Sequence, residues 1–354
     1  MPKKKKIKIV GISLFSGCGG LDMGCHLAKI PVIAAIDNDK DCLETLRLNA
    51  IFKHTKIYQA DLSTFSSSAI RTLLKQSKPS KFIIIGGPPC QPFSKASYWV
   101  GHKRRKGVND PRNLIGVFFK FIKKLKPDGF LFENVESIMH PKHKEIVPSI
   151  ISHVESLGYH HVLIRANALD YGVPQRRKRI FIIGSKREFS TTEPIKTHCP
   201  PEKCQETGLL PYESVKKFIG KYDMPRYFEK EENTANGTYG QELRQVPPGE
   251  NYFALTEKSN YAKPKFKAGR RFWSFLLKLH PDQPSWTIAA QPGPWVGPFH
   301  WTSRRLRVPE IAAIQTFPEN YKFFGNRRSI QKQIGNAVPV LMAKTMIEFL
   351  RQNL

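Results

Sequence analysis

Short runs of apolar, largely β-branched residues alternate with amphipathic segments through the first half of the chain. The apolar runs at 7–15, 31–36, 56–58, 82–85 and 130–132 predict strands. Helical spacing predicts helices over about 21–29, through Leu43, Leu46 and Leu48, and over 114–125. Strand–helix alternation is typical of a doubly wound, mostly parallel α/β sheet. The runs at 162–164 and 180–183 predict an antiparallel pair at one edge of that sheet.

The pattern changes after about residue 185. Between 185 and 300 the chain is rich in Pro, Gly, Tyr and charged residues, and no period is sustained. Helical spacing returns from Arg304, and the segment 340–350 predicts a final helix with an apolar face. We therefore expect a smaller, loop-rich domain inserted before the last part of an α/β domain.

The charge balance points to a polyanionic partner. The 354 residues include 57 Lys and Arg against 29 Asp and Glu, a formal net charge of +28. Such an excess favours nucleic acid, although an anionic membrane surface would also attract it. No apolar run is long enough to span a membrane, and no apolar core follows the basic N-terminus as a signal peptide requires. The basic run at 2–6 is either a nuclear targeting signal or a solvated arm.

The cysteines indicate a reduced, intracellular protein. Of the six, only Cys199 and Cys204 are close in sequence, and their spacing is not that of a zinc site. We therefore expect no metal.

One cysteine stands in a distinctive turn. The run 82–85 is followed directly by Gly86-Gly87-Pro88-Pro89-Cys90, which predicts a strand ending at a stiff turn. Ligands bind at the carboxyl ends of strands in open α/β sheets, so Cys90 is a candidate nucleophile. Taken alone, such a cysteine is more often a buried structural residue.

A nucleoside pocket is predicted at the end of the first strand. Phe15-Ser16-Gly17-Cys18-Gly19-Gly20 closes that strand and opens a helix, so backbone can approach a ligand closely. Asp37, at the end of the second strand, can bind ribose hydroxyls. A dinucleotide fingerprint would need glycine at Asp22, so a nucleoside without a pyrophosphate suits the loop better. Asp61, after the next strand, is placed to accept a hydrogen bond from an adenine amino group.

Five motifs in order resemble those of the cytosine-5 DNA methyltransferases, of the bacterial restriction–modification type. They are 14–21 (LFSGCGGL), 86–94 (GGPPCQPFS), 133–135 (ENV), 175–179 (QRRKR) and 333–339 (QIGNAVP), with a weaker match at 304–318. Ser13 stands where the family often has an acid, and Asn38 where it often has an aromatic residue. The resemblance covers about residues 13–184 and 302–345.

The resemblance implies a class I methyltransferase fold and S-adenosylmethionine as the methyl donor. Cys90 would add to C6 of a cytosine, Glu133 would contact N3 of the ring, and Arg177 and Arg179 would hold the base and the Cys90 region. Because a stacked cytosine hides C5 and C6, the base would flip out of the duplex. The cofactor residues implied are Phe15, Gly17, Gly19, Gly20, Leu21, Asp37, Asp61, Pro89, Asn336 and Val338.

The same resemblance predicts the DNA contacts and the roles of the domains. Residues 91–109 resemble the family's mobile catalytic loop, and 185–324 would recognise the target, beside a catalytic domain of 1–184 and 325–354. The predicted contacts to double-stranded DNA are Gln91, Ser94, Lys103, Arg104, Arg105, Lys106, Gln175, Thr287 and Arg304. We expect a monomer in the bacterial cytoplasm, associated with the nucleoid through DNA, and a cognate restriction endonuclease encoded nearby.

Three other protein classes share some of these features with the DNA cytosine-5 methyltransferases. A tRNA cytosine-5 methyltransferase shares most motifs, but it has a short recognition region with a Cys-Phe-Thr signature that this chain lacks. A zinc deaminase is rejected, because Phe93 stands where it needs a second cysteine. A DNA-binding protein on an inactive scaffold is disfavoured by the presence of Cys90, Glu133, Arg177 and Arg179.

Overall fold

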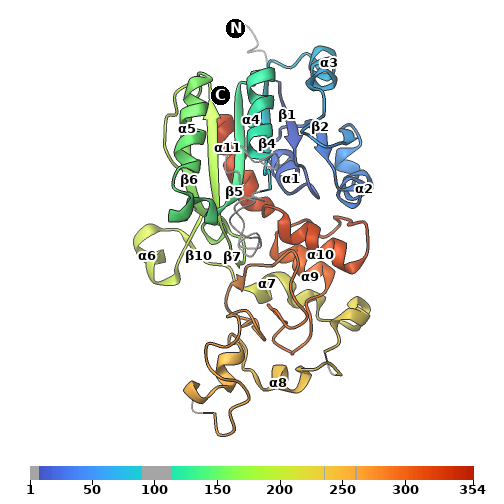
Figure 1. Ribbon diagram of the computed structural model, residues 1–354, viewed down its shortest axis with the longest axis vertical. Coiled ribbons are helices and arrows are strands. Elements are labelled where there is room, and N and C mark those ends of the chain that lie inside the picture. The colour runs from blue at the N-terminus through green and yellow to red at the C-terminus, as the bar shows by residue number, and fades with distance from the viewer. Residues whose placement is uncertain (1–7, 90–113, 235, 260) are drawn as a thin grey trace. The chain divides into compact units, whose positions relative to one another are not determined.

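The computed structural model describes residues 8–89, 114–234, 236–259 and 261–354, and the chain forms two compact units (Figure 1). The first unit comprises residues 1–167, 178–195 and 340–354, and the second comprises 168–177 and 196–339. Residues 325–339 thus belong to the second unit by their contacts, although the sequence groups them with the catalytic domain. The functional division at 184 and 325 stays a prediction.

A seven-stranded sheet forms the centre of the first unit, in the order β3-β2-β1-β4-β5-β8-β6. The first five of these strands are mutually parallel, and β8 is antiparallel to both β5 and β6. The strands are β1 (Ile9–Leu14), β2 (Val32–Asp37), β3 (Lys56–Gln59), β4 (Lys81–Gly86), β5 (Gly129–Val135), β6 (His160–Asn167) and β8 (Lys178–Ser185). The predicted fold class is confirmed, as is the antiparallel pair at one edge.

Helices cover both faces of this sheet. Residues of α3, α4 and α5 pack with Ile12, Ile84 and Phe130 in one apolar cluster, so these helices share a face. Gly129 faces the opposite side, because side chains alternate along a strand, and a Cβ there would meet Leu350 of α11 at 2.8 Å. The helices are α1 (Gly20–Leu27), α2 (Lys40–Leu48), α3 (Ser67–Ser77), α4 (Leu114–Leu125), α5 (Ile146–Ser156) and α11 (Val340–Gln352).

The second unit is built from short helices and long connections, as the absence of a sustained period predicts. Its core holds Tyr252, Phe275, Leu276 and Phe299, with Phe266 and Trp295 packed against them. Two small parallel pairs, β9–β10 and β7–β11, lie within it. Its elements are β7 (Gln175–Arg176), β9 (His198–Cys199), α6 (Cys204–Thr207), β10 (Leu210–Pro211), α7 (Val215–Ile219), α8 (Gly240–Gln245), β11 (Ser285–Trp286), α9 (Val308–Ile314) and α10 (Arg327–Asn336).

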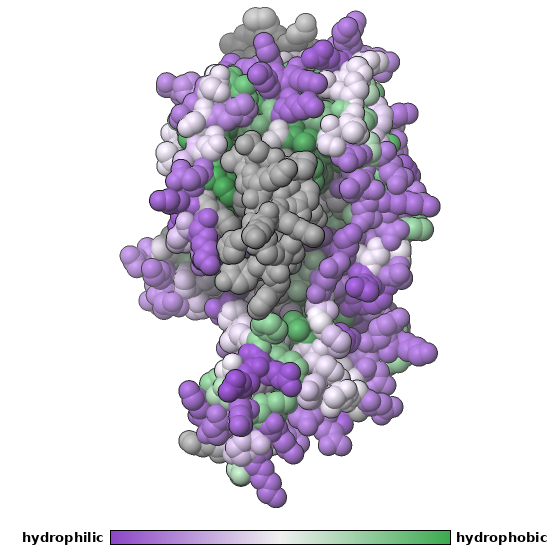
Figure 2. Space-filling model, in the orientation of Figure 1, coloured by the Kyte–Doolittle hydropathy of each residue, from purple (hydrophilic) through white to green (hydrophobic). Residues whose placement is uncertain are grey.

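Hydrophilic side chains cover most of the face shown in Figure 2. Among the residues that the structure describes, no helix has the length and apolar character needed to cross a membrane.

Candidate active site

The turn after β4 is packed tightly against the ends of β1 and β5. A Cβ on Gly86 would lie 2.5 Å from the carbonyl oxygen of Leu14, and one on Gly87 would lie 2.6 Å from Oε2 of Glu133. The side-chain amide of Asn134 donates a hydrogen bond to the carbonyl oxygen of Pro88 at 3.1 Å. The glycines are therefore needed for close approach, and Asn134 holds the turn beside the carboxyl end of β5.

Glu133 and Arg179 form a nearly buried ion pair on neighbouring strands. Nε of Arg179 lies 2.8 Å from Oε1 of Glu133, and the two side chains are 13% and 10% exposed. The antiparallel register, which places Val135 opposite Arg179, brings them together. Burial lowers the pKa of Arg179 and the attraction of Glu133 opposes that shift, so the guanidinium stays charged and orients the carboxylate.

The predicted nucleophile and the loop after it lie outside the described residues. This applies to Cys90, Gln91, Ser94 and the basic run 103–106. The last described residue before them, Pro89, is exposed at the end of the turn.

The glycine loop includes three residues with left-handed backbone. Gly17 has φ of 53° and Gly19 has φ of 85°, while the non-glycine Phe15 has φ of 54°. The amide of Gly17 donates to Oδ2 of Asp37 at 2.8 Å, and the amide of Asp39 donates to Oδ1 at 2.9 Å. The loop at the end of β1 is thereby tied to the acid at the end of β2.

These residues fit a nucleoside. Among the described residues, no atom beyond Gly17 and its two chain neighbours lies within 4 Å of a Cβ built on Gly17, so the loop borders open space. Each carboxylate oxygen of Asp37 has one backbone donor in the bonds above and a second lone pair for a ribose hydroxyl. Burial raises the pKa of Asp37. Gly20 and Leu21 are buried in the first turn of α1.

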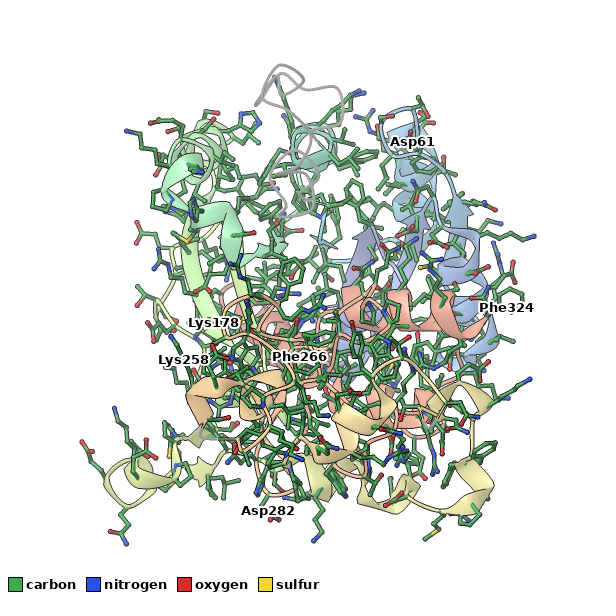
Figure 3. All side chains as sticks on the ribbon, turned by 60° about the horizontal axis from the view of Figure 1, so that its bottom comes forward. Asp61, Lys178, Lys258, Phe266, Asp282 and Phe324 are labelled. Carbon is green, nitrogen blue, oxygen red and sulfur yellow. The ribbon has the colours of Figure 1, made fainter. Side chains whose placement is uncertain are left out.

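Three other predicted cofactor residues lie outside the glycine loop and the end of β2. Asp61 is exposed on the loop after β3 (Figure 3), where Oδ1 accepts from the amide of Ser63 at 2.8 Å. Hydrogen bonds from Ser63 lower the pKa of Asp61. Asn336 and Val338 belong to the second unit, where Asn336 is exposed and Val338 is buried.

Sequence reasoning missed the role of Asp22. This carboxyl is buried beneath the glycine loop, and its Oδ2 accepts from Oγ of Ser13 at 3.0 Å. Its Oδ1 has no hydrogen-bond partner among the described residues. Burial raises the pKa of Asp22 to about 7. Two features of the sequence could have indicated the hydrogen bond between Ser13 and Asp22: the acid at position 22, where a dinucleotide fingerprint needs glycine, and the serine at position 13, where the family often has an acid. Neither feature indicates the bond without the other.

In the second unit, Arg177 is fully buried and binds backbone. Its Nη2 donates to the carbonyl oxygens of Gly335 at 2.7 Å and Ala337 at 3.0 Å, and its Nη1 donates to that of Ile288 at 3.3 Å. Arg177 thus holds the 333–339 motif in place, whereas Arg179 binds a carboxylate.

Gln175 is also buried and engaged within this unit. Its Nε2 donates to Oε1 of Gln315 at 3.0 Å, and its Oε1 accepts from the amide of Ile288 at 3.0 Å. Gln315 in turn donates to the carbonyl oxygen of Ile334 at 2.7 Å. Thr287 is exposed, and its hydroxyl donates to the carbonyl oxygen of Arg176 at 2.6 Å. Motifs far apart in sequence are therefore joined by one chain of buried amides.

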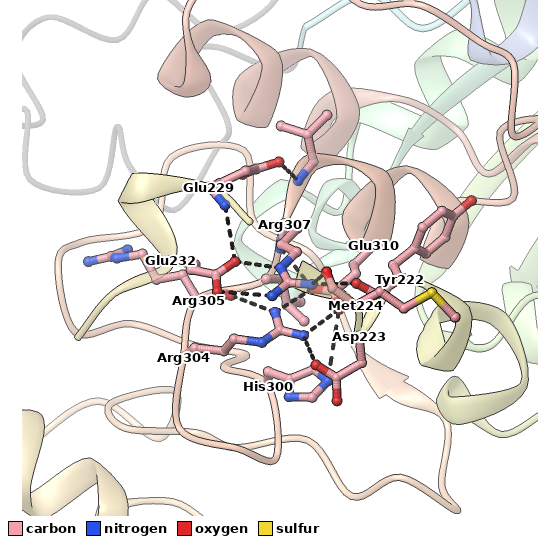
Figure 4. A network of polar contacts seen from close by, with 12 residues as sticks. Tyr222, Asp223, Met224, Glu229, Glu232, His300, Arg304, Arg305, Arg307 and Glu310 are labelled. Carbon is pink, nitrogen blue, oxygen red and sulfur yellow. Dashed lines mark hydrogen bonds and ion pairs between the residues drawn. The ribbon is translucent and has the colours of Figure 1, made fainter. Parts of the chain in front are cut away.

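Arg304 belongs to a buried polar network within the second unit (Figure 4). It binds Glu310 through both terminal nitrogens, at 2.8 and 2.7 Å, and Asp223 at 3.1 Å. Arg307 pairs with Glu232 in the same network. Burial, with Arg304 adding to it, lowers the pKa of His300 to about 3. The described contacts of Arg304 are thus internal, and its predicted phosphate contact stays a prediction.

Solved structures with the same fold are methyltransferases by their descriptions. The chain matches one described as a DNA modification methyltransferase encoded within an E. coli prophage, with a TM-score of 0.71 and 23% identity over 98% of this chain and 99% of that one. It also matches DNMT2 of Spodoptera frugiperda, with a TM-score of 0.65 and 15% identity over 98% and 100% of the two chains. These matches show that the chain has the same fold as those two structures.

Sequence comparison defines the family. The C-5 cytosine-specific DNA methylase family model matches residues 9–352, and this chain belongs to that family. The Type II methyltransferase M.SacI of Streptomyces achromogenes is 35% identical over 97% of this chain and 93% of its own length. M.BsuRI of Bacillus subtilis is 34% identical over 96% and 78% of the two chains. The protein is therefore a DNA cytosine-5 methyltransferase of the restriction–modification kind.

Proposed function

We propose that this chain methylates C5 of a flipped cytosine in a specific duplex sequence, with S-adenosylmethionine as the donor and Cys90 as the nucleophile. The observation that carries the proposal is the Glu133–Arg179 pair at the carboxyl end of β5, in contact with the turn that leads to Cys90. In this arrangement the carboxyl group lies at the same edge of the sheet as the turn 86–89, which directly precedes Cys90 in the sequence.

The chemistry proceeds by covalent catalysis. The thiolate of Cys90 forms a bond to C6, and the electrons of the C5–C6 double bond move so that C5 becomes nucleophilic. Glu133 contacts N3 through a proton held on its carboxyl group, and this hydrogen bond offsets the negative charge that develops on the ring, while Arg179 keeps the carboxyl group in position. C5 gains the methyl group as the bond from that group to the donor's positively charged sulfur breaks, which leaves a neutral thioether. C5 then loses its proton to water, the C5–C6 double bond re-forms, and the bond between Cys90 and C6 breaks, so that Cys90 leaves as thiolate.

S-adenosylmethionine supplies a methyl group on a positively charged sulfur. Asp37 binds the ribose hydroxyls, the loop of Phe15, Gly17, Gly19 and Gly20 leaves room for the nucleoside, and Asp61 accepts from the adenine. The proposed cofactor site also includes Leu21, Pro89, Asn336 and Val338. The open space at Gly17 and the second lone pairs of Asp37 support this assignment.

Duplex DNA is held by the residues around the flipped base. The proposed contacts to the DNA are those of Gln91, Ser94, the basic run 103–106, Gln175, Thr287 and Arg304. The region 185–324 selects the sequence. Extruding a base costs a few kcal/mol, which contacts to the opened duplex must offset. Methylation of this sequence protects host DNA from a cognate endonuclease.

The test is transfer of labelled methyl from S-adenosylmethionine to mixed-sequence duplex DNA, followed by bisulfite sequencing. Cys90→Ser and Glu133→Gln are each expected to reduce transfer by about 10² or more, since both act on the reacting ring. Cys204→Ser, which changes a cysteine of the second unit, serves as the matched control and should keep wild-type transfer. Full activity in Cys90→Ser would overturn the nucleophile assignment.

A further inference from the structure

Residues 262–273 of the second unit form a cationic aromatic segment. The sequence AKPKFKAGRRFW carries Lys263, Lys265, Lys267, Arg270 and Arg271 without an acid. All five of these cationic side chains are exposed. A polyanion is therefore the complementary partner for this surface.

The backbone of the segment is anchored from beneath. The hydroxyl of Tyr252 donates to the carbonyl oxygen of Arg271 at 3.0 Å and accepts from the amide of Gly269 at 3.2 Å. The side-chain amide of Asn251 donates to the carbonyl oxygen of Trp273 at 2.7 Å. Side chains on this segment are therefore presented from a defined backbone.

The aromatic residues of this region divide into two groups. Phe266, which Figure 3 labels, packs against Phe275 with ring centroids 5.5 Å apart, at the core of the unit. Phe272 and Trp273 instead point outward and are 78% and 54% exposed. Core packing therefore does not account for a Phe-Trp pair at this place.

Trp273 packs against a neighbouring ring that itself lies beneath a cation. It packs edge-on against Trp286 with centroids 4.3 Å apart, and the guanidinium of Arg176 lies over the Trp286 ring at 5.0 Å. These contacts leave more than half of Trp273 exposed while restricting its rotation.

We propose that Phe272 and Trp273 stack on the bases of the target duplex that lose a neighbour when the cytosine is extruded. Flat, rigid rings fit an unstacked base, and the surrounding lysines and arginines bind the adjacent phosphates. A protein partner is disfavoured because the segment would bury five positive charges. This inference rests on the proposed base flipping and names the residues that stabilise the opened duplex.

The test measures the Kd of the full-length enzyme for a duplex carrying the cytosine that wild-type enzyme methylates, mapped by bisulfite sequencing. Phe272→Ala and Trp273→Ala should each weaken binding about tenfold, in the range for loss of one aromatic–base stack. Trp273→Phe should regain most of the affinity, because it keeps a ring. Phe228→Ala is the matched control: Phe228 is 62% exposed in the same unit but precedes the acids Glu229, Glu231 and Glu232.

A second measurement separates stacking from general charge. Lys263→Gln, Lys265→Gln and Lys267→Gln together should lower the salt dependence of binding, whereas Trp273→Ala should leave that dependence unchanged. Wild-type affinity in both alanine variants of an active enzyme would overturn the inference. An altered sedimentation coefficient of Trp273→Ala with unchanged DNA affinity would overturn it as well, in favour of a protein contact. Absence of methyl transfer by the wild type would instead count against the proposed function.

Discussion

At the residue scale, the two glycines before the proline pair act by their lack of a side chain. Gly87 allows the turn to lie directly against Oε2 of Glu133, at a separation that a Cβ would reduce to 2.6 Å. The motif thus couples the turn that precedes Cys90 to the carboxylate on the next strand. A side chain at this point would move one or the other.

Gly87→Ala should therefore disturb the site more than the fold. We expect methyl transfer to fall by about tenfold or more, because a shift of the Glu133 carboxylate spoils its approach to the base. Gly11→Ala, where the nearest atom to the new Cβ is 3.4 Å away, is the control in the same sheet. Equal activity of the two variants, measured by labelled methyl transfer, would contradict the packing argument.

Asp22 predicts a dependence of stability on pH. Its pKa is raised from 3.8 to about 7 by burial, so the folded state binds the proton more tightly than the unfolded state. The stability that the protonated carboxyl contributes is fully present below pH 3.8 and is lost as pH rises to about 7.

Asp22→Asn removes this titration and keeps an acceptor for the Ser13 hydroxyl. The variant should match the wild type near pH 4 and exceed its stability at pH 8, by up to about 4 kcal/mol for a shift of this size. Urea unfolding at both values measures the difference. A difference between variant and wild type that stays constant across pH would show that Asp22 does not titrate in this range.

At the scale of elements, the first and last helices of the first unit depend on each other. A Cβ on Gly24 of α1 would lie 2.6 Å from Cβ of Ala343 in α11 and 2.8 Å from the carbonyl carbon of that residue. The close approach of these helices, more than 300 residues apart in sequence, therefore requires a glycine at position 24.

Gly24→Ala tests this contact. Overpacking should lower the free energy of unfolding by about 1–3 kcal/mol, in spite of the higher helix propensity of alanine. Ala343→Gly in the same chain removes the nearest atom and should restore part of the loss, a coupling that a double-mutant cycle measures. Additive effects of the two changes would mean that the helices can separate at no cost.

A second feature at this scale concerns residues 175–179, which comprise β7, Arg177 and the start of β8. Arg177 and Arg179 alternate along this segment, and the sequence alone suggests one shared role. Arg179 binds Glu133 in the first unit, whereas Arg177 binds carbonyl oxygens of Gly335 and Ala337 in the second. Two arginines of one motif thus have different roles. Arg179 orients the carboxylate of Glu133, and Arg177 binds the backbone of the 333–339 motif.

At the scale of the whole molecule, the net charge of +28 sets the character of DNA binding. Neutralising phosphates releases counterions, so affinity should fall steeply with salt. For 6–10 phosphate contacts we expect a loss of about 10³–10⁵ between 50 and 200 mM salt. Titration of a duplex by fluorescence anisotropy across this range checks the slope, and a nearly flat slope would contradict a phosphate-based interface.

Much of the architecture follows from the sequence because it depends on local pattern. The runs 82–85 and 130–132 lie within buried central strands, and the helix over 114–125 has the predicted bounds. The segment 185–300 lacks a period, and the structure there has short helices and long connections. Strand propensity and helical spacing are properties of neighbouring residues, so a sequence displays them directly.

The motifs likewise determine the family and, through it, the reaction. Only the tertiary structure decides which polar groups become partners. The sequence predicts that Gln175 contacts DNA, whereas in the structure it lies buried against Gln315. From the sequence, Asp22 is notable only because a dinucleotide fingerprint would need glycine there, whereas in the structure it binds Ser13. The tertiary structure likewise decides that Phe272 and Trp273 are exposed while the nearby Phe266 is partly buried against the core. Partners like these lie up to 140 residues apart in the chain. Their pairing depends on how the elements pack, and the packing of distant elements cannot be inferred from the local sequence.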